Sequence, residues 1–147
     1  MRWQIFLLGK FKIPMIGYTK PILKKLNEDN VEIKISLRRR TKNHLNSMYF
    51  GSLAIGADVA GGIHAFYFAK KYGYQVSFAF KGMSCEFFKR AESNCTFICN
   101  DGKKLETAIL KSKKTGDRIN EDTTVNVFNK EKELVAKFEM TVSVKCK

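Results

Sequence analysis

The sequence predicts an α+β fold in which an antiparallel sheet curves around one long apolar helix. Residues 51–69 carry no charged side chain except Asp58, and their apolar positions do not alternate, which indicates a buried helix. Segments on both sides of this helix alternate apolar and polar residues with a period of two, as half-buried strands do. A helix that is apolar all round has to be enclosed, and a curved sheet is its simplest enclosure.

The chain before the helix divides into a helical segment and one strand. Residues 1–28 mix apolar and basic residues, and Pro14 and Pro21 divide them into short helical pieces. We expect this segment to pack over the sheet; the alternative is that it lies on a membrane surface. Residues 31–40 alternate cleanly and predict a half-buried strand.

Three glycines interrupt the predicted helix at Gly56, Gly61 and Gly62. Each weakens a helix by about 1 kcal/mol relative to alanine. We expect the compensation to be a close approach of the sheet to the helix axis. A membrane span is not expected, because the apolar stretch is shorter than the usual ~20 residues and holds an aspartate near its centre.

The chain after the helix consists mainly of predicted strands. They lie near residues 76–80, 95–99 and 125–127, and the clearest covers 134–146. Residues 102–114 fit either a strand after a turn or a short helix. No internal repeat or linker divides the 147 residues. We therefore predict a single domain, with residues 1–28 as a helical segment and 31–147 as its core.

The composition indicates a basic, intracellular protein. The chain has 27 Lys and Arg against 14 Asp and Glu, a formal charge of +13, which concentrates anions near the surface. A nucleotide-bearing ligand or an anionic membrane fits this charge, as does solubility alone. Nucleic acid is not expected, because no Arg-rich tail occurs. The first residues do not form a secretory signal, so we expect a cytoplasmic location and four cysteines that remain thiols. No metal site is expected from their spacing.

Asp58 is the residue in the predicted helix that most needs an explanation. It lies between Ala57 and Val59, and burying an unpaired carboxylate is costly. It is therefore paired across a contact, protonated, or placed on a cavity. His64 lies six residues later, about 600° around a helix, so it faces away from Asp58 and is expected to be a hydrogen-bonded core or interface histidine.

The start of this helix offers a second chemical feature. Free backbone N–H groups near Gly51, together with the helix dipole, form a site for an anion or oxyanion. Gly51 lies seven residues before Asp58 on the same face, about 10 Å away along the axis. One reacting carbonyl cannot touch both within a single chain. In a two-fold dimer, the Gly51 end of one helix could meet Asp58 of the other.

This spacing resembles the signature of the hotdog-fold acyl-CoA thioesterases. Asn43 is followed by Gly51 and then by Asp58 in Gly-Ala-Asp-Val-Ala. The resemblance is to the phenylacetate-pathway type and a related thioesterase-like family. It implies a hotdog fold, in which a curved antiparallel sheet wraps around a long central helix, here with an extra N-terminal helical segment.

The resemblance also implies an acyl-CoA thioesterase with its pocket at a homodimer interface, and it leaves a tetramer of such dimers open. By resemblance, Asp58 is the base or nucleophile, the Gly51 N–H polarises the thioester carbonyl, and Asn43 lines the pocket. Coenzyme A would enter only as part of the substrate. The expected substrate-contacting neighbours are Tyr49, Phe50 and Ser52.

The sequence departs from the family pattern just before the helix. Relatives carry His and Gly residues where this chain has Met48, Tyr49 and Phe50. The Phe50 side chain could narrow the thioester channel. An alternative function is therefore a non-catalytic protein that binds acyl-CoA or a lipid intermediate on the same fold.

Overall fold

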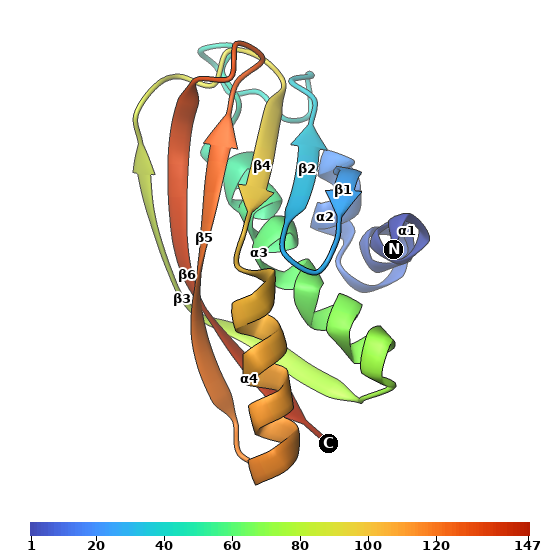
Figure 1. Ribbon diagram of the computed structural model, residues 1–147. Coiled ribbons are helices and arrows are strands. Elements are labelled where there is room, and N and C mark those ends of the chain that lie inside the picture. The colour runs from blue at the N-terminus through green and yellow to red at the C-terminus, as the bar shows by residue number, and fades with distance from the viewer.

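A six-stranded antiparallel sheet wraps around one long helix in the computed structural model, which describes all 147 residues (Figure 1). The sheet order is β1-β2-β4-β5-β6-β3, so that β3 and β1 form its edges. This is the predicted hotdog arrangement. The elements, in chain order, are α1 Arg2–Leu7, the π-helical η1 Leu8–Lys12, α2 Pro14–Thr19, β1 Ile22–Leu26, β2 Val31–Ile35, α3 Phe50–Tyr72, β3 Val76–Phe87, β4 Cys95–Cys99, α4 Gly102–Thr115, β5 Ile119–Phe128 and β6 Leu134–Cys146.

The glycines of α3 lie where the sheet comes closest to the helix. A Cβ on Gly56 would clash with the Phe97 ring of β4, and one on Gly61 would clash with the Met140 side chain of β6. The side chains of Phe97 and Met140 are both buried in the core. The expected close approach of the sheet is therefore confirmed, and it explains why a core helix contains residues of low helix propensity.

By length and composition alone, α3 would qualify as a membrane-crossing helix. Within the fold, however, 67% of its most apolar stretch is buried. Its apolar residues pack against strands β2, β4, β5 and β6. These contacts are those of a core helix.

The N-terminal helical segment ends earlier than the sequence predicted. Residues 1–28 were expected to be helical, but the helices stop at Thr19 and Ile22–Leu26 forms β1 at the sheet edge. Asn27 explains the difference, because its side-chain oxygen accepts hydrogen bonds from the backbone N–H groups of Asp29 and Asn30, at 3.0 and 2.9 Å. This tight turn folds β1 back onto β2 as a hairpin.

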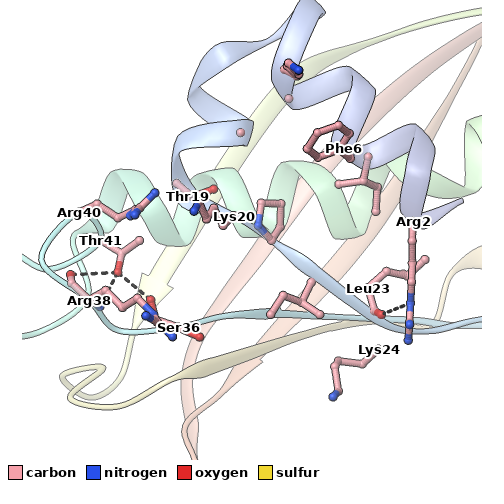
Figure 2. A pocket seen from close by; sticks show the side chains of 16 residues that line it. Arg2, Phe6, Thr19, Lys20, Leu23, Lys24, Ser36, Arg38, Arg40 and Thr41 are labelled. Carbon is pink, nitrogen blue, oxygen red and sulfur yellow. Dashed lines mark hydrogen bonds between the residues drawn. The ribbon is translucent and has the colours of Figure 1, made fainter.

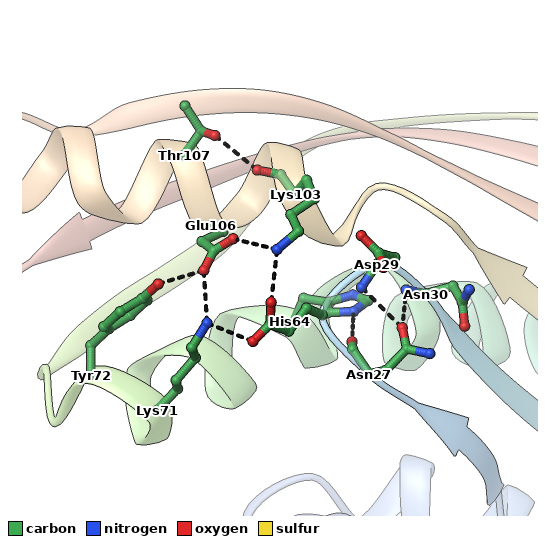
Figure 3. A network of polar contacts seen from close by, with 10 residues as sticks. Asn27, Asp29, Asn30, His64, Lys71, Tyr72, Lys103, Glu106 and Thr107 are labelled. Carbon is green, nitrogen blue, oxygen red and sulfur yellow. Dashed lines mark hydrogen bonds and ion pairs between the residues drawn. The ribbon is translucent and has the colours of Figure 1, made fainter.

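Residues 102–114, for which strand and helix were both open, form α4. Its apolar side packs against α3, β5 and β6. A second, smaller hydrophobic core forms there, in which Leu105 and Ile109 of α4 pack with Phe68 of α3. A polar network of Glu28, Lys71, Tyr72, Lys103 and Glu106 joins the start of α4 to the end of α3 (Figure 3). The hydrogen bond from Tyr72 and the two lysines lower the pKa of Glu106 to about 2.

His64 is fully buried beside this network and has the structural role that its position predicted. Its Nε2 lies 2.9 Å from the Asn27 carbonyl oxygen, to which it donates, and its Nδ1 has no partner (Figure 3). Burial lowers the pKa of His64 below its ordinary 6.5, although the hydrogen bond to Asn27 opposes this. The ring is therefore neutral at physiological pH.

This burial makes the protein less stable in acid. As pH falls below 6.5, the unfolded chain gains a proton on His64 before the folded chain does, so the free energy of unfolding decreases. We expect a lower midpoint of urea unfolding below pH 6.5 than above it, and a smaller difference in His64→Gln. His44→Gln is the matched control, because it removes a histidine from an exposed position. An unchanged dependence in His64→Gln would contradict this assignment.

Candidate functional site

Asp58 lies on a cavity of about 610 Å³ between α3 and the N-terminal segment. Most of the lining is apolar, with Gln4 and Lys12 as its other polar side chains. The segment that covers α3 supplies Leu8, Phe11 and Ile16 among others. The remaining lining residues are Met1, Ile5, Leu7, Ile13, Val59, Gly62, Ile63, Phe66 and Phe78.

The carboxylate of Asp58 has no partner within the chain. It accepts no hydrogen bond, and it forms no ion pair with Lys12 or any other base. Burial alone raises the pKa of this carboxyl above its ordinary 3.8, because the apolar surroundings disfavour the charged form. A carboxylate raised in this way is a stronger base than a solvated aspartate.

The N-terminus of α3 presents two free backbone donors. Tyr49 is the N-cap, and its carbonyl oxygen accepts from the N–H groups of Ser52 and Leu53 at 2.9 and 3.1 Å. The N–H groups of Phe50 and Gly51 donate to nothing in the chain. With the dipole of a 23-residue helix behind them, they form a donor pair suited to an oxyanion.

The side chains at this helix start are largely open to solvent. Tyr49 and Phe50 are 46% and 62% exposed, and their rings lie 4.7 Å apart. The Tyr49 ring covers the Cα of Gly51 so closely that a Cβ there would clash with it. Ser52, by contrast, is buried. Glycine at position 51 therefore allows the Tyr49 ring to pack directly against the start of the helix.

Asn43 organises the loop before the helix. Its side-chain oxygen accepts from the N–H groups of Leu45 and Ser47, at 2.9 and 3.1 Å, which closes an Asx-type turn. Its own N–H donates to the Ser47 carbonyl oxygen at 2.8 Å. Within the chain, Asn43 therefore holds the loop that leads to Tyr49, and its role toward a substrate stays a prediction.

One chain does not bring all the predicted residues together. Asp58 lines the apolar cavity, whereas Asn43, Tyr49, Phe50, Gly51 and Ser52 do not. The helix start and Asp58 are separated by two turns of α3, about 10 Å. The sequence did not reveal the N-terminal residues that cover the cavity. Their apolar character was visible, but nothing in the pattern showed that they cover the Asp58 face of α3.

A comparison with protein-family models assigns the chain by sequence. The model of the domain of unknown function DUF4442 matches residues 2–144. The chain belongs to this family. No curated protein matches it by sequence. The matched residues include Asp58 and the start of α3, and the description of the DUF4442 family names no activity.

Solved structures share the hotdog fold of this DUF4442 chain at low sequence identity. A Chlorobaculum tepidum protein of unknown function aligns with a TM-score of 0.86 and 12% identity, covering 99% of this chain and 94% of its own. A candidate thioesterase from Shewanella oneidensis aligns at 0.83 and 11%, covering 98% and 96%. A Haemophilus influenzae thioesterase aligns at 0.71 and 12%, covering 99% and 91%. These likenesses establish the fold.

Proposed function

We propose that this protein hydrolyses acyl thioesters, with Asp58 as the general base or nucleophile. The observation that carries the proposal is an unpaired carboxylate of raised pKa on an apolar cavity. Asp58 is half-buried, and a carboxylate that is partly desolvated and has no partner is a candidate for chemistry. The thioesterase descriptions of the Shewanella and Haemophilus proteins, which share the fold, support the same reaction class.

The proposed reaction needs one base and one oxyanion site. Asp58 takes a proton from a water molecule whose oxygen attacks the thioester carbonyl carbon, and the N–H groups of Phe50 and Gly51 stabilise the oxyanion that forms. The carbon–sulfur bond then breaks, and the thiolate leaves and takes up a proton. If Asp58 attacks directly, an anhydride forms instead, and water hydrolyses it in a second step.

A homodimer would complete this site. The two features lie about 10 Å apart on one helix, so the Gly51 end of one protomer is proposed to meet Asp58 of its partner. Strand β3 is suited to such an interface, because it is a sheet edge that pairs only with β6 and exposes Met83 and Phe87. Long apolar edge strands pair readily with a second copy.

The cavity suits the acyl part of a thioester, because apolar side chains dominate its lining. The exposed rings of Tyr49 and Phe50 at the donor pair favour one alternative, a protein that binds acyl-CoA without cleaving it. The two functions differ in the fate of the bound ligand, since only hydrolysis releases free thiol.

The experiment is thiol release from short-chain, aromatic and long-chain acyl-CoAs, with calorimetric binding measured in parallel. We expect release with at least one class, and the panel then identifies the substrate. Binding without release by the folded dimer would favour the acyl-binding alternative and identify Phe50 as the first residue to replace.

A further inference from the structure

A second cavity, of about 820 Å³, opens between the N-terminal segment, β1 and the loop after β2 (Figure 2). None of its sixteen lining residues is acidic. Three hydroxyl side chains lie among the charged ones, at Thr19, Ser36 and Thr41. The basic lining residues are Arg2, Lys10, Lys20, Lys24, Arg38 and Arg40.

These six cations have no anionic partner in the protein. None of them takes part in any of the ion pairs of the fold. The first acidic residue of the chain is Glu28, so residues 1–27 contribute only positive charge. Like charges that surround one cavity repel each other and focus a positive potential into it, which an anion would relieve.

The fold holds several of these groups in place. Arg40 donates from Nη1 to the Tyr18 carbonyl oxygen at 3.5 Å and lies over the Tyr18 ring, 5.7 Å from its centre. Arg2 donates from Nε to the Leu23 carbonyl oxygen at 3.2 Å. The Thr41 hydroxyl donates to the Ser36 carbonyl oxygen at 2.7 Å, which fixes the loop that carries the arginines.

Two glycines let the helical pieces cross closely at this cavity. A Cβ on Gly9 would lie 2.7 Å from the Gly17 Cα, and one on Gly17 would lie 2.5 Å from the Gly9 carbonyl oxygen. Both glycines line the cavity. The close crossing of η1 and α2 therefore forms part of the wall of the cavity.

We propose that this basic cavity binds the phosphate groups of a ligand whose apolar chain occupies the Asp58 cavity. Ile5 of α1 lines both cavities, so the two cavities lie next to each other on neighbouring faces of that helix. Arginine and lysine are the side chains that bind phosphate, and Arg40 is already oriented. The ligand class is an acyl chain joined to a phosphorylated group, either the coenzyme A end of an acyl thioester or a phospholipid headgroup. The coenzyme A source rests on the proposed function, whereas the phosphate site does not.

Calorimetric titration with inorganic pyrophosphate tests the site in the full-length protein. Lys20→Gln/Arg40→Gln should weaken pyrophosphate binding by about tenfold or more, because two charged donors are lost. Lys111→Gln/Lys114→Gln removes the same charge from exposed positions of α4 that form no ion pair, and it should keep wild-type binding. No binding by the wild type, or equal weakening by both pairs, would overturn the site in favour of diffuse charge.

Two further arms identify the source of the phosphate. If it is coenzyme A, adenosine 3′,5′-bisphosphate competes with pyrophosphate, and Lys20→Gln/Arg40→Gln raises KM for acyl-CoA but not for the phosphate-free acyl-N-acetylcysteamine. If it is a lipid headgroup, vesicles of equimolar phosphatidylcholine and phosphatidylglycerol bind the wild type and not this variant. Failure to hydrolyse either thioester would refute the proposed function and leave the pyrophosphate result standing.

Discussion

Replacing Asp58 with asparagine is expected to abolish turnover while making the protein more stable. Asparagine has the same shape but cannot act as a base, so kcat/KM should fall by about 10³-fold, within the range for loss of a general base. The neutral amide also removes the cost of partly desolvating an unpaired charge. We therefore expect the free energy of unfolding at neutral pH to rise by about 1 kcal/mol, a usual gain in stability when a residue kept for activity is replaced.

The stability gain has a definite pH dependence. The pKa of Asp58 is raised above 3.8 in the folded protein, so the folded state holds this proton at a pH where the unfolded chain has lost it. Wild-type stability therefore decreases as pH rises through this interval, and Asp58→Asn should not show this decrease. Asp117→Asn, at an exposed position without an ion pair, is the control for urea unfolding and thiol release. Full turnover in Asp58→Asn, or a loss of stability, would contradict the assignment.

Adding a single methyl group at Gly102 is expected to cost about 3 kcal/mol of folding free energy, at the upper end of the range for overpacking. A Cβ there would clash with the Glu28 carbonyl oxygen and lie 2.8 Å from His64 Nε2 and 2.9 Å from the Asp29 carbonyl oxygen. The contacts are mostly with backbone, which cannot move aside as a flexible side chain can. The Gly102 N–H also donates to the Asp29 carbonyl oxygen at 3.0 Å, and this bond would have to break or stretch.

Gly82 in β3 provides the matched control. The only atom near a Cβ at that position is the Thr141 hydroxyl oxygen, 3.9 Å away, so Gly82→Ala should change stability by about 0.5 kcal/mol or less. Urea unfolding of both variants measures the difference. Equal stability of the two would show that the turn before β2 yields easily and that the start of α4 is not tightly packed against it.

The sequence predicted the parts of the fold that depend on periodicity. The long apolar run identified α3, and the alternation in 134–146 identified β6 over its whole length. Cys95, Cys99 and Cys146 are buried in strands, where they alternate with their neighbours as apolar residues do. The glycines of α3 were correctly explained by packing, because a core helix tolerates them only where another element comes close.

The sequence was less informative where tertiary contacts decide. In β1 the burial pattern is irregular, and its strand form depends on the Asn27 turn and on pairing with β2. In α4 the buried residues Leu105, Ala108, Ile109 and Ser112 do recur at helical spacing, and packing against α3 and β6 selects the helix over the strand. Asp58 was found because it contradicts its apolar surroundings. The basic cavity was not found, because Lys20, Arg40 and Arg2 come from three separate elements.

The most direct test of Asp58 as the base is the pH dependence of kcat/KM for thioester hydrolysis by the wild-type protein. Asp58 must be ionised to act, and its burial raises its pKa. We expect kcat/KM to rise with pH through an apparent pKa above the ordinary 3.8 and then to level off. A rise in kcat/KM centred at or below pH 3.8 would show that a solvated carboxylate performs the reaction. A rate independent of pH would show that no carboxylate does.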